Sequence, residues 1–118
     1  MDNSAPPRRN QNNSGVIDWG TLVLAVLTEG ACHGYEIARQ VERRAGDDLT
    51  LAHGTLYPVL HQLERDGYIA SAWEGEPGER RRRTYQITPT GSGELQARMR
   101  RWRAVNRVLG PLAAEGDS

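Results

Sequence analysis

Apolar residues recur every three or four positions in three segments of the first half of the chain, which predicts three amphipathic helices. We expect the first helix from Asp18, a residue type that caps helix N-termini, to about residue 28. The second helix is expected over about residues 34–45, with Gly46 ending it. Each helix has one apolar face to bury, so together the three predict a small shared core.

The third predicted helix carries Leu56, Leu60 and Leu63 at spacings of four and three positions. Pro58 lacks an amide N–H and is therefore tolerated only near the start of a helix. We expect this helix to begin near residues 54–55 and to stop at the next glycine.

The pattern then changes to two short runs of β-branched and aromatic residues, over 69–74 and 82–88, which predict two strands. Residues 75–80 between them are rich in Gly, Pro and Glu and predict a turn or flexible loop. Thr88 and Pro89 favour the start of a fourth helix, as N-cap and first helical residue. Gly110-Pro111 is expected to end that helix.

The fourth predicted helix carries an apolar stripe with spacings of four, three, four and three positions, which is typical of a helix that packs along another helix. Two valines widen this stripe on one side. We call it the C-terminal stripe, and the residues expected at its interface are Leu95, Met99, Trp102, Val105, Asn106 and Leu109.

Three helices, a hairpin and a further helix predict an α+β, mostly helical fold. A helix able to enter a DNA groove, followed directly by a hairpin with a cationic tip, is the order found in winged helix-turn-helix proteins. We expect a disordered arm at 1–15, a winged helix-turn-helix domain at 16–88, a C-terminal dimerisation helix at 89–112 and a frayed tail at 113–118.

Composition sharpens this picture. The chain has 118 residues, enough for one modest core, and a hydrophobic content of 37%, which favours polar tails or a core completed by a second subunit. The net charge is zero, yet residues 29–79 carry ten acidic residues and four arginines, whereas 80–107 carry nine arginines and one glutamate. This asymmetry predicts a cationic surface in the second half of the chain.

The sequence also indicates a location. The single cysteine, Cys32, cannot form an internal disulfide, which suits a reducing compartment. No segment has the roughly 20 apolar residues of a membrane span, and the first residues do not resemble a signal peptide. We therefore expect a cytoplasmic protein with no membrane partner.

Five short motifs follow one another in a characteristic order: His33-Gly34-Tyr35, Gly54–Pro58, Leu63–Ile69, Arg82–Tyr85 and Ile87–Gly91. In this order they resemble the PadR family of bacterial transcriptional regulators, in its short branch with one C-terminal helix. The resemblance covers roughly residues 16–112. It implies a homodimer joined through the C-terminal and N-terminal helices, bound to palindromic double-stranded promoter DNA, usually as a repressor that a small molecule releases.

Candidate DNA contacts lie on the outer face of the third helix, opposite its leucines. Hydrogen-bond donors predominate there, and phosphates and guanine edges accept such bonds. An ordinary solvated helix face is the alternative. The resemblance implies that Tyr57 binds phosphate or packs at the border of this face, and Tyr35 on the second helix has the same two interpretations. The candidates on these helices are Tyr35, Thr55, Tyr57, Pro58, His61, Gln62 and Arg65.

The arginine run Arg80, Arg81, Arg82 and Arg83 is the most cationic stretch of the chain. Alternation along a strand predicts two guanidinium groups on each face near the hairpin tip, where they suit phosphate or minor-groove contact. The alternative is a solubilising cluster paired locally with the three glutamates of the same loop.

Trp102 is the leading ligand candidate, because a tryptophan on a dimerising helix meets its symmetry mate and two indoles can hold a flat aromatic compound. The C-terminal region resembles family members that regulate multidrug efflux. Met99 and Trp19 are further candidates for such an effector site. The alternative is that these residues only fill a core or interface. Arg98, Arg100, Arg101 and Arg103 lie largely off the stripe and are expected to keep the helix soluble, with a position near DNA as the alternative.

Other classes of function find less support. Cys32-His33, His53 and His61 do not have structural zinc spacing, so we expect no metal and no cofactor. No nucleophile motif, phosphate-binding glycine loop or carboxylate pair indicates an enzyme. Three alternatives stand beside a ligand-responsive regulator: a regulator without a ligand pocket, a winged-helix protein-interaction module that uses the acidic region 29–79, and a metal sensor.

Overall fold

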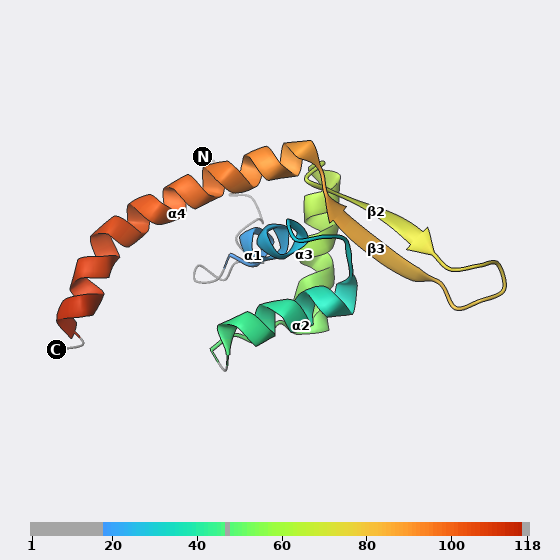
Figure 1. Cartoon of the computed structure of the whole chain (residues 1–118), viewed down its shortest axis with the longest axis horizontal. Helices are drawn as coiled ribbons and strands as arrows, with labels where there is room; N and C mark the ends of the chain where they lie inside the picture. Colours follow the sequence, from blue (N-terminus) through green and yellow to red (C-terminus); the bar gives the residue numbers. More distant parts are fainter. Residues whose placement is uncertain (1–17, 47, 117–118) are drawn as a thin grey trace, which may run out of the picture.

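The computed structural model describes residues 18–46 and 48–116, and confirms an α+β, mostly helical winged helix-turn-helix fold (Figure 1). The expected arm at 1–15 lies outside the described residues. A three-stranded antiparallel sheet has the order β1-β3-β2, with the short first strand not anticipated from the sequence. The elements are α1 (Trp19–Leu27), β1 (Cys32–His33), α2 (Gly34–Ala45), α3 (His53–Arg65), β2 (Ile69–Glu74), β3 (Arg82–Ile87) and α4 (Pro89–Gly116).

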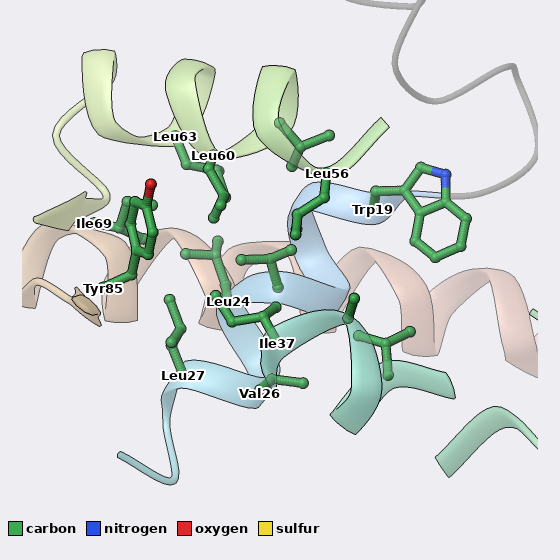
Figure 2. Packing of buried hydrophobic residues seen from close by; sticks show 14 of the residues in the cluster. Trp19, Leu24, Val26, Leu27, Ile37, Leu56, Leu60, Leu63, Ile69 and Tyr85 are labelled. Atoms are coloured by element: carbon green, nitrogen blue, oxygen red, sulfur yellow. The ribbon is translucent and has the colours of Figure 1, made fainter. Parts of the chain in front are cut away.

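The core lies between α1, α2, α3 and the inner ends of the strands (Figure 2). Leu56, Leu60 and Leu63 of α3 point into it, as their spacing predicts. Ile69 of β2 and Tyr85 of β3 extend this core under the hairpin. The apolar face of α3 is thereby fixed, so its opposite face must point outward.

Local interactions explain where α1 and α3 begin. Asp18 caps α1 by accepting hydrogen bonds from the Thr21 amide, at 3.2 Å, and the Thr21 hydroxyl, at 2.6 Å. Helix α3 begins at His53, slightly earlier than predicted, because the Ala52 carbonyl already accepts bonds from the amides of the first turn.

A Schellman motif ends α3. The amide of Tyr68 donates to the Leu63 carbonyl at 2.9 Å, and that of Gly67 donates to the Glu64 carbonyl at 3.0 Å. Gly67 has φ of 81°, a conformation in which a Cβ atom is unfavourable. This turn sends the chain from α3 directly into β2, so the hairpin position follows from the end of α3.

Helix α4 is attached at the same turn. Thr88 donates its hydroxyl to the Gly67 carbonyl at 2.6 Å, accepts from the Gly91 amide at 3.0 Å, and donates its own amide to the Tyr68 carbonyl at 3.0 Å. Gly91 packs directly on that carbonyl. The start of α4 is therefore held against the junction of α3 and β2.

The prediction that α4 ends at Gly110-Pro111 was wrong, because the helix continues through Pro111 to Gly116. Proline removes one intrahelical hydrogen bond and crowds the preceding turn, which kinks a helix without necessarily ending it. The alanine-rich residues that follow are good helix formers. Residues 113–116 of the expected frayed tail thus belong to the helix, which curves in Figure 1.

Arg98 differs from its expected solubilising role. Its side chain is only 19% exposed and lies between α1 and α4. It donates to Glu94 at 2.7 Å and to the Thr21 hydroxyl at 3.3 Å, lies 3.8 Å from Asp18, and stacks 5.8 Å from the Tyr68 ring centroid. Arg98 therefore connects α4 to the start of α1.

Candidate nucleic-acid interface

A groove of about 610 Å³ lies between the start of α2, the middle of α3 and the hairpin. We call the hairpin, residues 69–87, the wing. Aromatic rings and guanidinium groups share the lining, an arrangement suited to a nucleic-acid backbone. The lining residues are His33, Gly34, Tyr35, Tyr57, His61, Trp73, Arg80, Arg82, Arg83 and Tyr85.

Tyr35, near the start of α2, and Tyr57, in the second turn of α3, are exposed. A Cβ atom at position 34 would lie 3.1 Å from the Tyr57 hydroxyl, so the glycine at this position makes room for the tyrosine. His53 packs against the Tyr57 ring edge-on at 5.9 Å, and His33 stacks with Tyr35 at 6.4 Å. Both phenols are thus held at the groove.

The N-terminus of α2 borders this groove, whereas α3 contributes Tyr57 and His61 from its middle. No side chain of the described residues caps either helix, whose N-cap positions are His33 and Ala52. The first amide groups of a helix lack intrahelical partners and attract anions. The uncapped start of α2 therefore lies close to the guanidinium groups that line the groove.

The predicted outer face of α3 is outward in the structure. Pro58, His61, Gln62 and Arg65 are exposed, and Thr55 is half-buried. The side-chain amide of Gln62 donates a hydrogen bond to the Asp66 carboxylate at 3.1 Å, and Arg65 donates to the side-chain oxygen Oε1 of Gln62 at 3.4 Å. His61 lines the groove, whereas these hydrogen bonds hold Gln62 and Arg65 along the helix.

The four wing arginines have two different environments. Arg80, Arg81 and Arg82 are exposed and form no ion pair with any residue in the described part of the chain, and Arg82 lies 6.0 Å from the Tyr35 ring centroid. Arg83 instead points toward α3 and pairs with Glu64.

The glutamates of the same loop were the predicted local partners of these arginines, and two of them have other partners in the structure. Glu74 pairs with His33 at 3.5 Å, and Glu79 accepts the Glu76 amide at 3.2 Å. The acidic groups of the loop therefore do not neutralise Arg80, Arg81 and Arg82 by direct pairing within the described chain.

The residues of the C-terminal stripe divide into two groups. Leu95 is 6% exposed and Met99 is half-buried against the core, so both already pack within their own chain. From Trp102 onward the stripe is exposed, and Trp102 itself is 58% exposed. The exposed apolar residues of this half are Trp102, Val105, Val108, Leu109 and Leu112.

The three ligand candidates are in unlike environments. Trp19 is 7% exposed and belongs to the core cluster (Figure 2), which agrees with the alternative that it only fills the core. Met99 is half-buried, and Trp102 lies on the exposed half of α4.

Among residues 18–46 and 48–116, no group of three or more metal-ligating side chains is assembled. Burial and the nearby charges of Glu36 and Glu29 raise the pKa of the Cys32 thiol, which makes it a poorer ligand and nucleophile. Over the same residues, no helix has the length and hydropathy that a membrane span requires.

The chain matches the model of the transcriptional regulator PadR-like family over residues 23–97. It belongs to this family. The PadR-like match includes the parts of α2, α3 and the wing that line the groove, and it agrees with the expectation of a regulator rather than an enzyme.

Two relatives from Mycobacterium tuberculosis show the same relationship. The transcriptional regulator Rv3488 is 34% identical to this PadR-like chain over 73 residues, and the probable transcriptional regulator Rv1176c is 30% identical over 73 residues. The matches cover 62% of this chain, but only 64% and 39% of the length of the two relatives.

Solved structures agree with the fold. A transcriptional regulator from Clostridium thermocellum has a TM-score of 0.72 and 27% identity, covering 89% of this chain and 97% of its own. A PadR family regulator from Clostridium difficile has a TM-score of 0.68 and 30% identity, covering 80% and 96%. Bacillus subtilis PadR in complex with operator DNA, at 23% identity over 69% and 46% of the chains, shares the fold with a TM-score of 0.63.

Sequence reasoning missed three features of this surface: the strand β1, the inward direction of Arg83, and the pairing of Gly34 with Tyr57. Two signals were available. Glycine directly before Tyr35 is a residue type that permits close approach, and Arg83 lies on the same strand face as Tyr85.

Proposed function

We propose that this PadR-like chain is a DNA-binding transcriptional regulator that reads double-stranded promoter DNA with α3 and the wing. The observation that carries the proposal is the groove in which Arg80 and Arg82, which have no ion-pair partner among the described residues, lie beside Tyr35 and Tyr57. Helix α3 would enter a major groove while the wing and the start of α2 contact the flanking phosphates. The complex of a homologue with operator DNA supports the same partner.

We further propose that the protein acts as a homodimer. The exposed half of the C-terminal stripe presents large apolar side chains at helical spacing, which a second α4 would bury. Leu95 and Met99 are already packed in their own chain, so the interface would begin at about Trp102. The two copies of α3 and the wing, one from each subunit, would then read half-sites roughly 34 Å apart.

A fluorescence anisotropy titration with DNA from directly upstream of the gene, repeated between about 50 mM and 200 mM salt, tests whether α3 and the wing bind DNA. We call α3 and the wing together the reading head. Arg82→Gln is expected to weaken binding several-fold and to lower the salt slope by about one. Arg103→Gln, at an exposed position on α4, removes the same charge away from the groove and serves as the control. Absence of any binding at low salt would refute the proposal and favour a protein-interaction module.

The dimer has its own test. Leu109→Asp places a charge on the exposed stripe and is expected to convert a dimer to a monomer in light scattering, while circular dichroism stays helical. Gln96→Asp adds the same charge at an exposed position of α4 outside the stripe, and is the control that should remain dimeric. A wild-type monomer at micromolar concentration would contradict the dimer.

An effector site at the dimer interface is the finer proposal, and the exposure of Trp102 supports it. A planar aromatic compound between two Trp102 side chains would change the separation of the heads and release a repressor from DNA. Quenching of tryptophan fluorescence by a planar cationic dye, compared with Trp102→Ala, tests this. Equal quenching in both proteins would contradict the effector site and favour the alternative of a regulator without a ligand pocket.

A further inference from the structure

We infer that Arg83 is a positioning residue that joins the wing to the recognition helix α3, and that it does not read DNA phosphate as its neighbours in the arginine run do. This inference rests on the proposed function of the groove. It separates one of four consecutive arginines from the other three by its contacts rather than by its sequence.

The first observation is the direction of the side chain. In the β2–β3 register, Ile69 faces Ile87, Ser71 faces Tyr85 and Trp73 faces Arg83. Strand alternation places these three pairs on one face of the hairpin. Burial decreases along this face, from Ile69 in the core to exposed Trp73. Arg83 therefore lies where the apolar core ends, at the edge of the groove that it lines together with Arg80 and Arg82.

The second observation is a polar network that connects three elements. Arg83 donates through Nε to the Ser71 hydroxyl at 2.9 Å, and that hydroxyl donates to Oε2 of Glu64 at 2.7 Å. The Arg83 Nη2 atom lies 3.5 Å from Oε1 of the same carboxylate. Glu64 belongs to α3, Ser71 to β2 and Arg83 to β3, so one guanidinium links the recognition helix to both wing strands.

Two aromatic rings complete the environment of this guanidinium. Its central carbon lies 5.5 Å from the Trp73 ring centroid and 5.9 Å from that of Tyr85. Arginine stacks well on aromatic faces, and such contacts hold its planar group in one orientation. Burial raises the pKa of the Tyr85 phenol although Arg83 opposes this, so the ring stays neutral at physiological pH.

The network has two consequences for DNA reading. A two-stranded hairpin is marginal by itself, so the angle between wing and α3 depends on what packs beneath it. The network also occupies the carboxylate of Glu64, which would otherwise present an unpaired negative charge on the recognition helix. Loss of Arg83 is therefore expected to loosen the wing and expose that charge.

Ser71→Ala is the most discriminating variant, because it removes the bridging hydroxyl without changing any charge. If Arg83 positions the wing, Ser71→Ala lowers DNA affinity about 3- to 10-fold and leaves the salt slope unchanged, since no phosphate contact is lost. If Arg83 binds phosphate, the same variant frees it, and affinity stays equal or rises. Arg82→Gln, measured in parallel, gives the slope change of a phosphate contact.

A double-mutant cycle of Glu64→Gln and Arg83→Gln gives an independent readout. If Glu64 and Arg83 act through one another, Glu64→Gln weakens DNA binding in the wild-type background. In the Arg83→Gln background, Glu64→Gln then has little effect on DNA binding or strengthens it. Equal effects of Glu64→Gln in both backgrounds would overturn the inference. Arg83→Lys keeps the charge but not the planar donor set, and is expected not to rescue affinity.

The outcomes separate the two proposals. Wild-type protein without DNA binding at low salt refutes the reading head itself. Wild-type binding together with an unchanged affinity of Ser71→Ala refutes only the role of Arg83. Thermal unfolding of each variant shows whether the head is still folded, and Ser71→Ala, the mildest change, keeps the test valid if Arg83→Gln unfolds.

Discussion

The carbonyl oxygen of Tyr68 occupies the space in which a side chain at position 91 would begin. A Cβ atom on Gly91 would lie 2.0 Å from this oxygen, far inside van der Waals contact. The obstacle is backbone, held by the Thr88 amide at 3.0 Å, and cannot rotate away. The absence of a side chain at Gly91 thus lets α4 begin against the turn that joins α3 to the wing.

Gly91→Ala is therefore expected to destabilise the protein by about 1–3 kcal/mol, or to detach the start of α4, because overpacking against fixed backbone costs free energy. Thermal unfolding measured by circular dichroism checks this. Gly93→Ala is the matched control, since nothing lies within 4 Å of a Cβ there. It is expected to stabilise the helix by up to about 1 kcal/mol, and equal melting of the two variants would contradict the packing argument.

A second prediction concerns Gly34. An alanine at this position would place its Cβ 3.1 Å from the Tyr57 hydroxyl, and the exposed tyrosine would have to move by a few tenths of an ångström. We expect Gly34→Ala to keep wild-type stability but to lower DNA affinity about 3- to 10-fold, because one phosphate-reading group is displaced. Anisotropy titration measures the affinity, with Gly93→Ala as the control. Unchanged affinity would remove Tyr57 from the proposed interface.

A third prediction concerns Thr84, which lies between Ala72 and His33 in the sheet. Its hydroxyl is buried and has no hydrogen-bond partner among the described residues. Thr84→Val keeps the shape and removes an unsatisfied polar atom, so the free energy of unfolding should rise by about 1 kcal/mol. Thr21→Val is the contrast, because the Thr21 hydroxyl is bonded to Asp18. Urea denaturation distinguishes them, and destabilisation by Thr84→Val would reveal a partner for the hydroxyl.

A fourth prediction concerns the reactivity of Cys32. Burial and two nearby glutamates raise its pKa, so at neutral pH the folded protein holds less thiolate than a free cysteine does. Alkylation by iodoacetamide should be slow, and its rate should rise at a higher pH than in the denatured chain. Titrating the rate against pH in both states measures the shift. A folded-state reaction faster than that of the denatured chain would contradict it.

Local pattern predicted most secondary structure. The limits of α2 and β2 and the inward leucines of α3 follow from residue spacing and glycine positions, which depend on neighbours a few residues away. The short strand β1 was missed and α3 begins slightly earlier than predicted. The end of α4 was also wrong, because the cost of Pro111 alone did not decide whether the helix stopped.

The side chains of the site required more than local pattern. Arg80 to Arg83 are chemically identical in the sequence, and Leu95 and Leu109 occupy the same stripe. Distant chain segments distinguish them: Glu64 and Ser71 hold Arg83 inward, while the core covers Leu95 and leaves Leu109 exposed.

The sequence by itself determined which segments form the four helices and the two hairpin strands, and that arginines gather at the wing, because spacing and composition act over one or two turns. Only the tertiary structure decided which arginine of the groove pairs with the recognition helix, and where α4 leaves the core. These choices depend on burial and pairing between residues far apart in the chain, such as the 19 positions between Glu64 and Arg83.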